Sequence, residues 1–154
     1  MKIHTSNSVS IVAMQLRSTL DTIVKDVADL PEKLAADLIP AGMLPTGPMM
    51  FLYDDVIDDP HHEFDLRIAL PLSVDDIARY KGPYTTTRLE PFHFVETVLY
   101  GDIAELGPKA YEPLFQEIHA SGLTVTRFVR EVYQNFVDPS SPDNETRVQV
   151  GVVA

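Results

Sequence analysis

Two stretches of the chain, 12–72 and 92–152, carry the same residue pattern at a separation of 80 positions. The matched pairs include Ile23 with Ile103, Gly42 with Gly122, Tyr53 with Tyr133, and Arg67 with Arg147. A half of this size would bury too little surface to be more than marginally stable alone. We therefore expect one domain over residues 1–154, built from two similar repeats at 9–72 and 92–153 that are joined by a linker at 73–91.

One matched position differs in chemistry between the repeats. Phe51 in the first repeat corresponds to Glu131 in the second, so that a carboxylate stands where the other copy has an aromatic ring. Both residues fall within segments that read as strands. The mismatch makes Glu131 the first candidate for a functional residue in an otherwise duplicated scaffold.

Composition limits the kinds of partner that the chain can have. Its 154 residues are 45% hydrophobic, which suits one globular domain with a real core, and its net charge is −11. A field of this sign repels the phosphates of nucleic acids and attracts cationic small molecules over long range. The simpler alternative is an acidic surface that only keeps the protein soluble.

The chain contains no cysteine, which excludes disulfides, thiolate nucleophiles and Cys-ligated zinc. The first ten residues lack the apolar segment of a signal peptide. No apolar run approaches the length of a membrane span. From these features we expect a cytoplasmic protein with no membrane partner.

Hydrophobic periodicity predicts a strand, a helix and two more strands in each repeat. The predicted strands are 9–16, 49–53, 63–72, 92–100, 124–134 and 145–153, and the predicted helices are 19–39 and 103–120. Pro113 predicts a kink or a late start in the second helix, because proline cannot donate the helical hydrogen bond. The linker shows a turn pattern at Lys81-Gly82-Pro83 and an extended, exposed stretch at 85–87.

These elements predict an α+β fold with a mainly antiparallel sheet. The two strand–helix–strand–strand modules should be related by a pseudo-twofold axis. We expect each helix to cover one sheet face, and the remaining faces to meet across the axis and leave a central ligand cleft.

Strand alternation decides which residues share the face of Glu131. It puts Tyr133 beside Glu131, and it puts Met49, Phe51 and Tyr53 on the matching face of the first repeat. If Val148, Val150 and Val152 lie under the helix, Arg147 faces the cleft together with Glu131. A cross-strand ion pair of Glu131 with Arg147 or Arg127 is then the purely structural alternative.

A carboxylate among aromatic rings suits a cationic or planar amphipathic molecule, because the ring faces attract cations and the carboxylate neutralises them. Burial would also raise the pKa of Glu131, so Glu131 and Tyr133 are the candidates for acid–base catalysis. Tyr100 and Tyr111 either line the same pocket or fill the core.

The acidic segment 54–63, which contains His61 and His62, suggests a metal site at first sight. Adjacent histidines on extended chain point in opposite directions, so both would not bind one ion. A solvated hairpin loop is the preferred interpretation, and no metal is expected. The sequence also holds no phosphate-binding, dinucleotide-binding or hydrolase motif, and no cofactor is expected.

The second repeat resembles the GyrI-like family, the effector-binding domains of bacterial multidrug-responsive transcription regulators, which also occur as stand-alone proteins. The residues that carry the resemblance are Tyr100-Gly101, Tyr111 with Leu114, Gly122, Arg130-Glu131-Val132-Tyr133 and Asp138-Pro139. The first repeat matches through Gly47-Pro48, Tyr53 and Ile68-Ala69-Leu70-Pro71. The pattern departs from the family at Ile103, where a tyrosine is common, and at 61–63 and 81–91.

The resemblance implies two strand–helix–strand–strand modules around a ligand cleft, with the glutamate that binds cationic drugs at Glu131 and cleft aromatics at Tyr53 and Tyr133. It therefore favours ligand contact over an ion pair for Glu131. The function that it implies is a stand-alone protein that senses or sequesters amphipathic, cationic small molecules. No helix-turn-helix segment precedes the domain, so we do not expect this chain alone to bind DNA.

Two other functions are implied by other members of the family. Some stand-alone members resemble hydrolases that open strained cyclopropane rings of electrophilic natural products, with Glu131 as general base and Tyr133 or Tyr53 as the acid or orienting group. Others resemble inhibitors of DNA gyrase, which would give the acidic surface a protein partner. Whether the chain is an enzyme is left open by its sequence.

Overall fold

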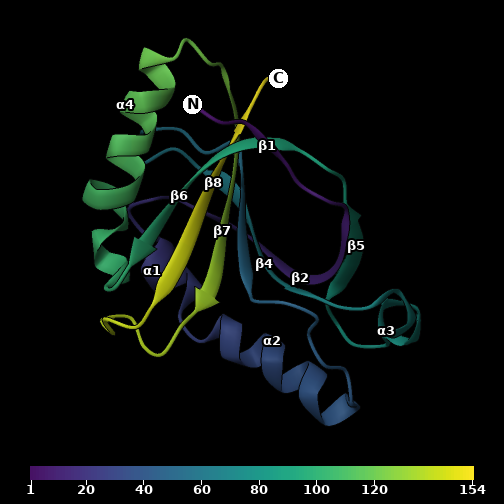
Figure 1. Cartoon of the computed structure of the whole chain (residues 1–154). Coiled ribbons are helices and arrows are strands. Elements are labelled where there is room, and N and C mark those ends of the chain that lie inside the picture. The colour runs from purple at the N-terminus through teal and green to yellow at the C-terminus, as the bar shows by residue number, and fades with distance from the viewer.

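The computed structural model describes residues 1–154 and contains one eight-stranded sheet. In the order in which they lie side by side, the strands are β1 (His4–Thr5), β6 (His93–Tyr100), β8 (Glu145–Val152), β7 (Val125–Asn135), β3 (Met50–Asp54), β4 (Phe64–Pro71), β2 (Val9–Ser18) and β5 (Thr85–Leu89). Every neighbouring pair is antiparallel. The predicted α+β fold with a mainly antiparallel sheet is therefore confirmed (Figure 1).

The first predicted helix, 19–39, is two helices. The structure has α1 (Ile23–Val27) and α2 (Leu30–Leu38), followed by a 3₁₀ turn at Ile39–Ala41. Ala28 separates the two helices with a φ of 41°, a backbone conformation that a helix cannot contain. Pro31 lies in the first turn of α2, where its missing N–H removes no helical hydrogen bond.

The second predicted helix is also interrupted. A 3₁₀ turn at Ile103–Glu105 and a π-helical turn at Gly107–Tyr111 precede α4 (Glu112–Ala120). Pro113 then occupies the first turn of α4, which agrees with the predicted late start. The amide of Glu112 donates to the carbonyl of Gly107 across the wider π turn.

The two copies meet where β3 pairs with β7, which we call the seam. Phe51 lies directly opposite Glu131 there, and the flanking pairs are Leu52 with Arg130 and Met50 with Val132. Residues 51 and 131 are also the equivalent positions of the two repeats. The pseudo-twofold axis of the duplication therefore passes between Phe51 and Glu131, the matched pair in which a carboxylate replaces an aromatic ring.

The helices of both copies lie on the same face of the sheet, which corrects the predicted arrangement. On β4, Phe64 and Leu66 pack in a cluster with Leu114 of α4, whereas Ile68 packs in a cluster with Leu34 of α2. These three side chains of β4 alternate with a third cluster on the opposite face of the sheet: Ile11, Ala13, Met50, Leu52, Ala69 and Val132. The cleft thus lies between the helices, on the face that they cover.

The segment between the copies is more structured than the sequence indicated. It forms α3 (Val74–Arg79), capped by the side chain of Ser73, and the edge strand β5, which pairs with β2. The extended stretch predicted at 85–87 belongs to β5. None of the helices has the length and apolar character needed to cross a bilayer.

Candidate functional site

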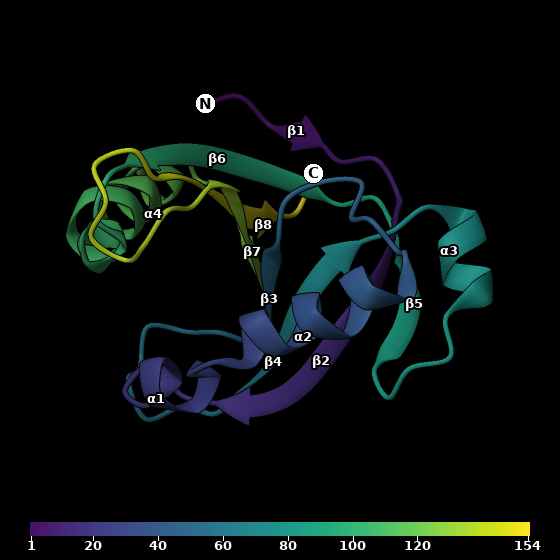
Figure 2. The same ribbon diagram turned by 90° about the horizontal axis from the view of Figure 1, so that it is seen from below.

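A cavity of about 1640 Å³ lies over the seam, between the helices of the two halves. Figure 2 shows α1 and α2 on one side of β3 and β7 and α4 on the other. Of the 31 residues that line the cavity, 20 are hydrophobic, so its walls suit the apolar surface of a ligand. A drug-sized ligand usually occupies a pocket of roughly 300–1,000 Å³, and this cavity is larger.

Glu131 forms part of the cavity wall, although its side chain is only 3% exposed. Tyr53 donates a hydrogen bond of 2.8 Å to its Oε1 atom, and Tyr133 donates one of 2.7 Å to the same oxygen. Tyr111 donates a third hydrogen bond, to Oε2. Three tyrosine hydroxyls from β3, β7 and the π-helical turn thus converge on one carboxylate.

Burial raises the pKa of Glu131 above its usual range, and the hydrogen bonds from Tyr111, Tyr133 and Tyr53 partly offset this shift. Burial also raises the pKa of each of these tyrosines well above its usual range, with the negative charge of Glu131 as a further cause. The phenols therefore remain protonated near neutral pH and act as donors to the carboxylate.

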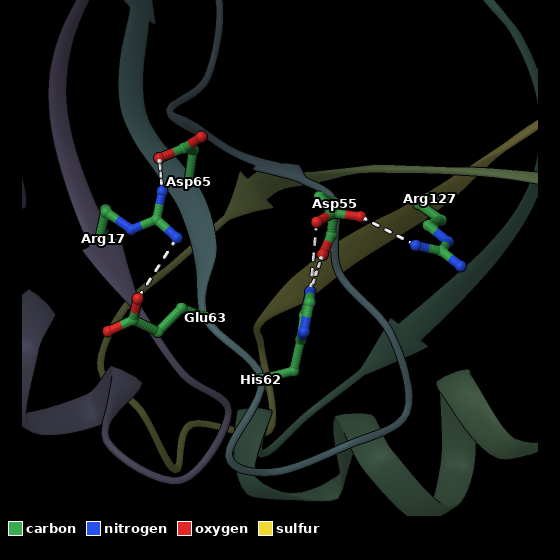
Figure 3. Close-up of polar contacts among 6 residues, drawn as sticks. All are labelled: Arg17, Asp55, His62, Glu63, Asp65 and Arg127. Carbon is green, nitrogen blue, oxygen red and sulfur yellow. Dashed lines mark hydrogen bonds and ion pairs between the residues drawn. The ribbon is translucent and has the colours of Figure 1, made fainter.

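No cationic side chain compensates the charge of Glu131. Arg127, which also lines the cavity, donates to Asp55 at 3.2 Å instead (Figure 3). Arg147 pairs with Glu96 at 3.0 Å and with Glu145 at 3.4 Å. The alternative of a cross-strand ion pair is therefore wrong for both arginines.

The prediction that Arg147 faces the cleft is wrong because it assumed that helix and cleft lie on opposite faces. Val148 is the cross-strand neighbour of Glu131 and packs with Leu114 of α4, so helix and cleft share its face. Arg147 then points to the other face by alternation. Tyr100 is excluded in the same way, because its neighbour Leu99 belongs to the core under α4, and Tyr100 is 70% exposed outside the cavity.

The structure brings the other predicted site residues together. The cavity wall contains Glu131, Tyr133, Tyr53, Phe51, Met49 and Tyr111. Phe51 packs edge-to-face against Tyr133, with ring centroids 4.9 Å apart and an interplanar angle of 67°. Within hydrogen-bond distance of Glu131 only tyrosines occur, so the site is a carboxylate in a cage of phenols and aromatic faces.

Two further aromatic residues of the cavity wall, Phe115 and Phe136, were not singled out from the sequence. Phe115 follows Tyr111 by one helical turn, and this spacing of four residues could have indicated that both rings share a face of α4. Phe136 comes directly after β7, where strand alternation no longer indicates direction. Only the folded chain shows that it turns toward the cavity.

Residues 55–63 of the acidic segment form the loop between β3 and β4, and His62 has its polar partners within this loop. The Nε2 atom of His62 lies 2.9 Å from the carbonyl oxygen of Asp55 and 3.3 Å from its Oδ2 atom (Figure 3). His61 instead lies near Asp21, at 3.8 Å. The two histidines have different partners, and the structure places no group of three or more His, Asp or Glu side chains where a metal could bind.

No protein-family model matches the chain, and a search of curated proteins gives no match. Solved structures do match it. SAV2435 bound to tetraphenylphosphonium has a TM-score of 0.70 and 17% identity, over 99% of this chain and 93% of that one. The C-terminal domain of EcmrR has a TM-score of 0.76 and 16% identity, over 99% and 96% of the two chains. This chain spans 56% of the full EcmrR chain in its complex with DNA.

A hydrolase from Listeria innocua is a more distant match, with a TM-score of 0.57 and 11% identity over 99% of this chain and 91% of that one. The structural neighbours SAV2435 and the C-terminal domain of EcmrR are GyrI-like effector-binding domains. The duplicated fold predicted from the resemblance is therefore confirmed. At these identities the likeness establishes the fold, and the function has to be argued from the site.

Proposed function

We propose that this chain, which has the fold of the GyrI-like effector-binding domains, binds amphipathic cationic small molecules in the cavity over its seam. The observation that carries the proposal is the buried, uncompensated carboxylate of Glu131 in the wall of a largely apolar cavity. It accepts hydrogen bonds from Tyr53, Tyr111 and Tyr133, and it has no cationic partner.

A buried carboxylate without a countercharge is costly, because it loses its hydration and gains no opposite charge in return. The three hydroxyls stabilise the charge by hydrogen bonding but leave it uncancelled. A ligand cation placed in the cavity would supply the missing countercharge. The free protein is thus arranged so that an organic cation removes an unfavourable feature that nothing in the chain removes.

The cavity wall also suits the apolar part of such a ligand. Phe51 and Tyr133 offer ring faces and edges next to Glu131, and Tyr111 stacks with Phe115, with ring centroids 6.3 Å apart. Aromatic faces attract cations and bury large apolar surfaces. The net charge of −11 would raise the local concentration of cations around the protein.

The tetraphenylphosphonium bound by SAV2435 is a ligand of this class, a permanent cation enclosed by aromatic rings. The likeness of the two folds makes tetraphenylphosphonium a suitable first probe. It carries no titratable group, so any pH dependence of its binding would come from the protein.

A hydrolase with Glu131 as general base is the second candidate, and the raised pKa of Glu131 is the observation in its favour. The hydrogen bonds weigh against it. An ionised carboxylate offers roughly four acceptor positions, and three of these already accept from tyrosines. A cation needs none of the remaining lone pairs, whereas a base that activates water does. The third hypothesis, inhibition of DNA gyrase, has no structural observation in its favour and stays a prediction.

The test is a calorimetric titration with tetraphenylphosphonium at pH 8, in the original protein and in Glu131→Gln. Glutamine keeps the shape of the side chain, and its Oε1 atom can accept from Tyr53 and Tyr133. Its amide NH2 would donate to the Tyr111 hydroxyl in place of accepting from it, so the charge is lost while each of these groups keeps a hydrogen-bond partner. We expect binding in the original protein and a loss of about 100-fold in affinity in the variant, the equivalent of about 2.7 kcal/mol.

Glu112→Gln is the matched control, because Glu112 is an exposed carboxylate that also lines the cavity. Its loss should change the affinity by less than about threefold, as expected for a solvated charge. Equal effects of the two substitutions would show that only the overall acidity matters. Absence of binding to the original protein would contradict the proposal, and turnover of an electrophilic substrate that Glu131→Gln abolishes would favour the hydrolase.

A further inference from the structure

The cavity wall has aromatic rings beyond those that surround Glu131. Two half-exposed rings, Phe115 at 40% and Phe136 at 48% exposure, lie on its wall. Each contacts a tyrosine that donates to Glu131. Phe115 stacks on Tyr111 with an interplanar angle of 16°, and Phe136 meets Tyr133 edge-to-face, with centroids 6.1 Å apart and an angle of 84°.

Two short rows of rings therefore run from the buried carboxylate toward solvent. One row is Tyr111 and then Phe115, and the other is Phe51, Tyr133 and then Phe136. Within each row the inner tyrosine is largely withdrawn from solvent, whereas the outer phenylalanine remains partly in water. An aromatic ring left half in water at the wall of an open cavity is a surface that a ligand can cover with a gain in free energy.

The surroundings of the two rings are apolar as well. Leu20, Val24 and Val137 also line the cavity and are at least 41% exposed. The matching positions of the first repeat show that the rings are not a consequence of the duplication. Pro31 and Ala35 stand where the second repeat has Tyr111 and Phe115, although both also line the cavity. The rings on the helical side of the cavity wall thus belong to the second half only.

We propose that Phe115 and Phe136 form an outer aromatic subsite that holds the second ring system of an elongated cation whose charged end lies at Glu131. This inference rests on the proposed function and specifies its ligand class: long amphipathic cations with aromatic groups separated by a linker, rather than compact ones. The cavity volume of about 1640 Å³ supports it, because a compact ligand beside Glu131 would leave the outer part empty.

The experiment compares two permanent cations with the same charged end. Benzyltrimethylammonium reaches only the surroundings of Glu131, and benzyldimethyl(3-phenylpropyl)ammonium adds a second ring on a flexible arm. Affinities are measured by calorimetry in the original protein, in Phe115→Ala and in Phe136→Ala. We expect the elongated cation to bind more tightly to the original protein and to lose about fivefold to tenfold in each variant.

The compact cation should change by less than about twofold in both variants, because it does not reach the outer rings. Phe115→Leu keeps an apolar side chain and should lose less than Phe115→Ala with the elongated cation, which guards against a general disturbance of α4. Val74→Ala is the matched control, since Val74 is 75% exposed on α3 and lies outside the cavity.

The outcomes separate this inference from the proposed function. If neither cation binds the original protein, both are overturned. If both cations bind it but the variants weaken the two equally, or weaken neither, Phe115 and Phe136 form no outer subsite while the proposed function stands. Selective loss of the elongated cation supports the inference.

Discussion

Across the seam, the first half of the molecule presents Phe51 and the second half presents Glu131, directly opposite each other on the axis that relates the halves. The tyrosines that flank the axis are the same in both halves. Tyr53 and Tyr133 are equivalent residues, and both donate to the same oxygen of Glu131. A symmetric pair of phenols thus holds a carboxylate that exists in one copy only.

A duplicated scaffold can in this way acquire an asymmetric binding site. Two glutamates on the axis would lie directly opposite each other across the paired strands. Two neighbouring carboxyl groups in a buried environment cannot both be ionised, because their like charges repel each other. One glutamate and one phenylalanine avoid this conflict and leave a single negative charge beside an aromatic face. Tyr111 and Phe115, in place of Pro31 and Ala35, extend the asymmetry to the helices.

The largest effect is expected for Phe51→Glu, which places a glutamate at both matched positions on the axis. We expect a loss of about 3 kcal/mol in the free energy of unfolding at pH 8, because a second buried carboxylate faces the first and the contact with Tyr133 is lost. Protonation of one carboxylate relieves the repulsion, so the loss should be smaller at pH 5. Urea denaturation at the two pH values measures this.

Phe51→Gln serves as the control for Phe51→Glu, because it removes the ring without adding a charge. Its loss of stability should be the same at pH 5 and at pH 8. A pH-independent loss for Phe51→Glu as well would show that the two carboxylates do not interact across the seam.

The exchange of the two residues, Phe51→Glu together with Glu131→Phe, tests whether the symmetric tyrosines accept the carboxylate from either copy. Tyr53 and Tyr133 should still donate to it, whereas Tyr111 has no equivalent on the other side. We expect tetraphenylphosphonium to bind about tenfold more weakly than to the original protein, a difference of about 1.4 kcal/mol, in a calorimetric titration. Complete loss of binding would mean that Tyr111 and α4 define the site, and the symmetric pair does not.

The scaffold itself should respond symmetrically. Gly42 and Gly122 are equivalent residues that follow the helices with φ values of 74° and 72°, and a Cβ atom at either position would meet nothing within 4 Å. Substitution by alanine should therefore cost only the left-handed conformation, about 1 kcal/mol in each case. Urea denaturation of Gly42→Ala and Gly122→Ala should give equal losses, with tetraphenylphosphonium affinity unchanged. Clearly unequal losses would show that the halves differ in their scaffold too.

The smallest effect at pH 8 is expected for Tyr111→Phe, which removes the donor that has no symmetric equivalent. The raised pKa of Glu131 means that cation binding is present above that pKa and is lost as the pH falls through it. Since the hydrogen bond from Tyr111 lowers the pKa, its loss moves the midpoint to higher pH. The affinity at pH 8 should change by less than about threefold.

Titrations with tetraphenylphosphonium between pH 5 and pH 8 measure the midpoint for Tyr111→Phe. Tyr100→Phe is the matched control, because Tyr100 is exposed on the other face of the sheet, and its midpoint should equal that of the original protein. Affinity that does not depend on pH in the original protein would argue against Glu131 as the charge that the cation meets.

Several parts of the site could be predicted because strand alternation is a local rule. The period of two put Glu131 and Tyr133 on one face and Phe51 and Tyr53 on another, and the structure has them on one cavity wall. The prediction for Arg147 failed although the alternation along its strand was right. It assumed which face of the sheet carries the helix, and that depends on how the whole sheet packs.

The elements missed in the sequence have a similar explanation. The strand β1 has only two residues, and β5 is an edge strand of mostly exposed residues, so neither carries a hydrophobic pattern. The break at Ala28 and the π-helical turn before α4 are adjustments of backbone conformation that periodicity does not reveal.

The sequence alone shows that the chain is duplicated, that its fold class is α+β, and that the carboxylate of Glu131 stands where the other copy has a phenylalanine. These features follow from residue identity and short-range periodicity. The tertiary structure decided that the mismatch lies on the axis, that Tyr53, Tyr111 and Tyr133 converge on it, and that Arg127 and Arg147 pair elsewhere. Tyr53 and Tyr111 lie 78 and 20 positions from Glu131 in the chain, and only the packing of strands and helices brings them to it.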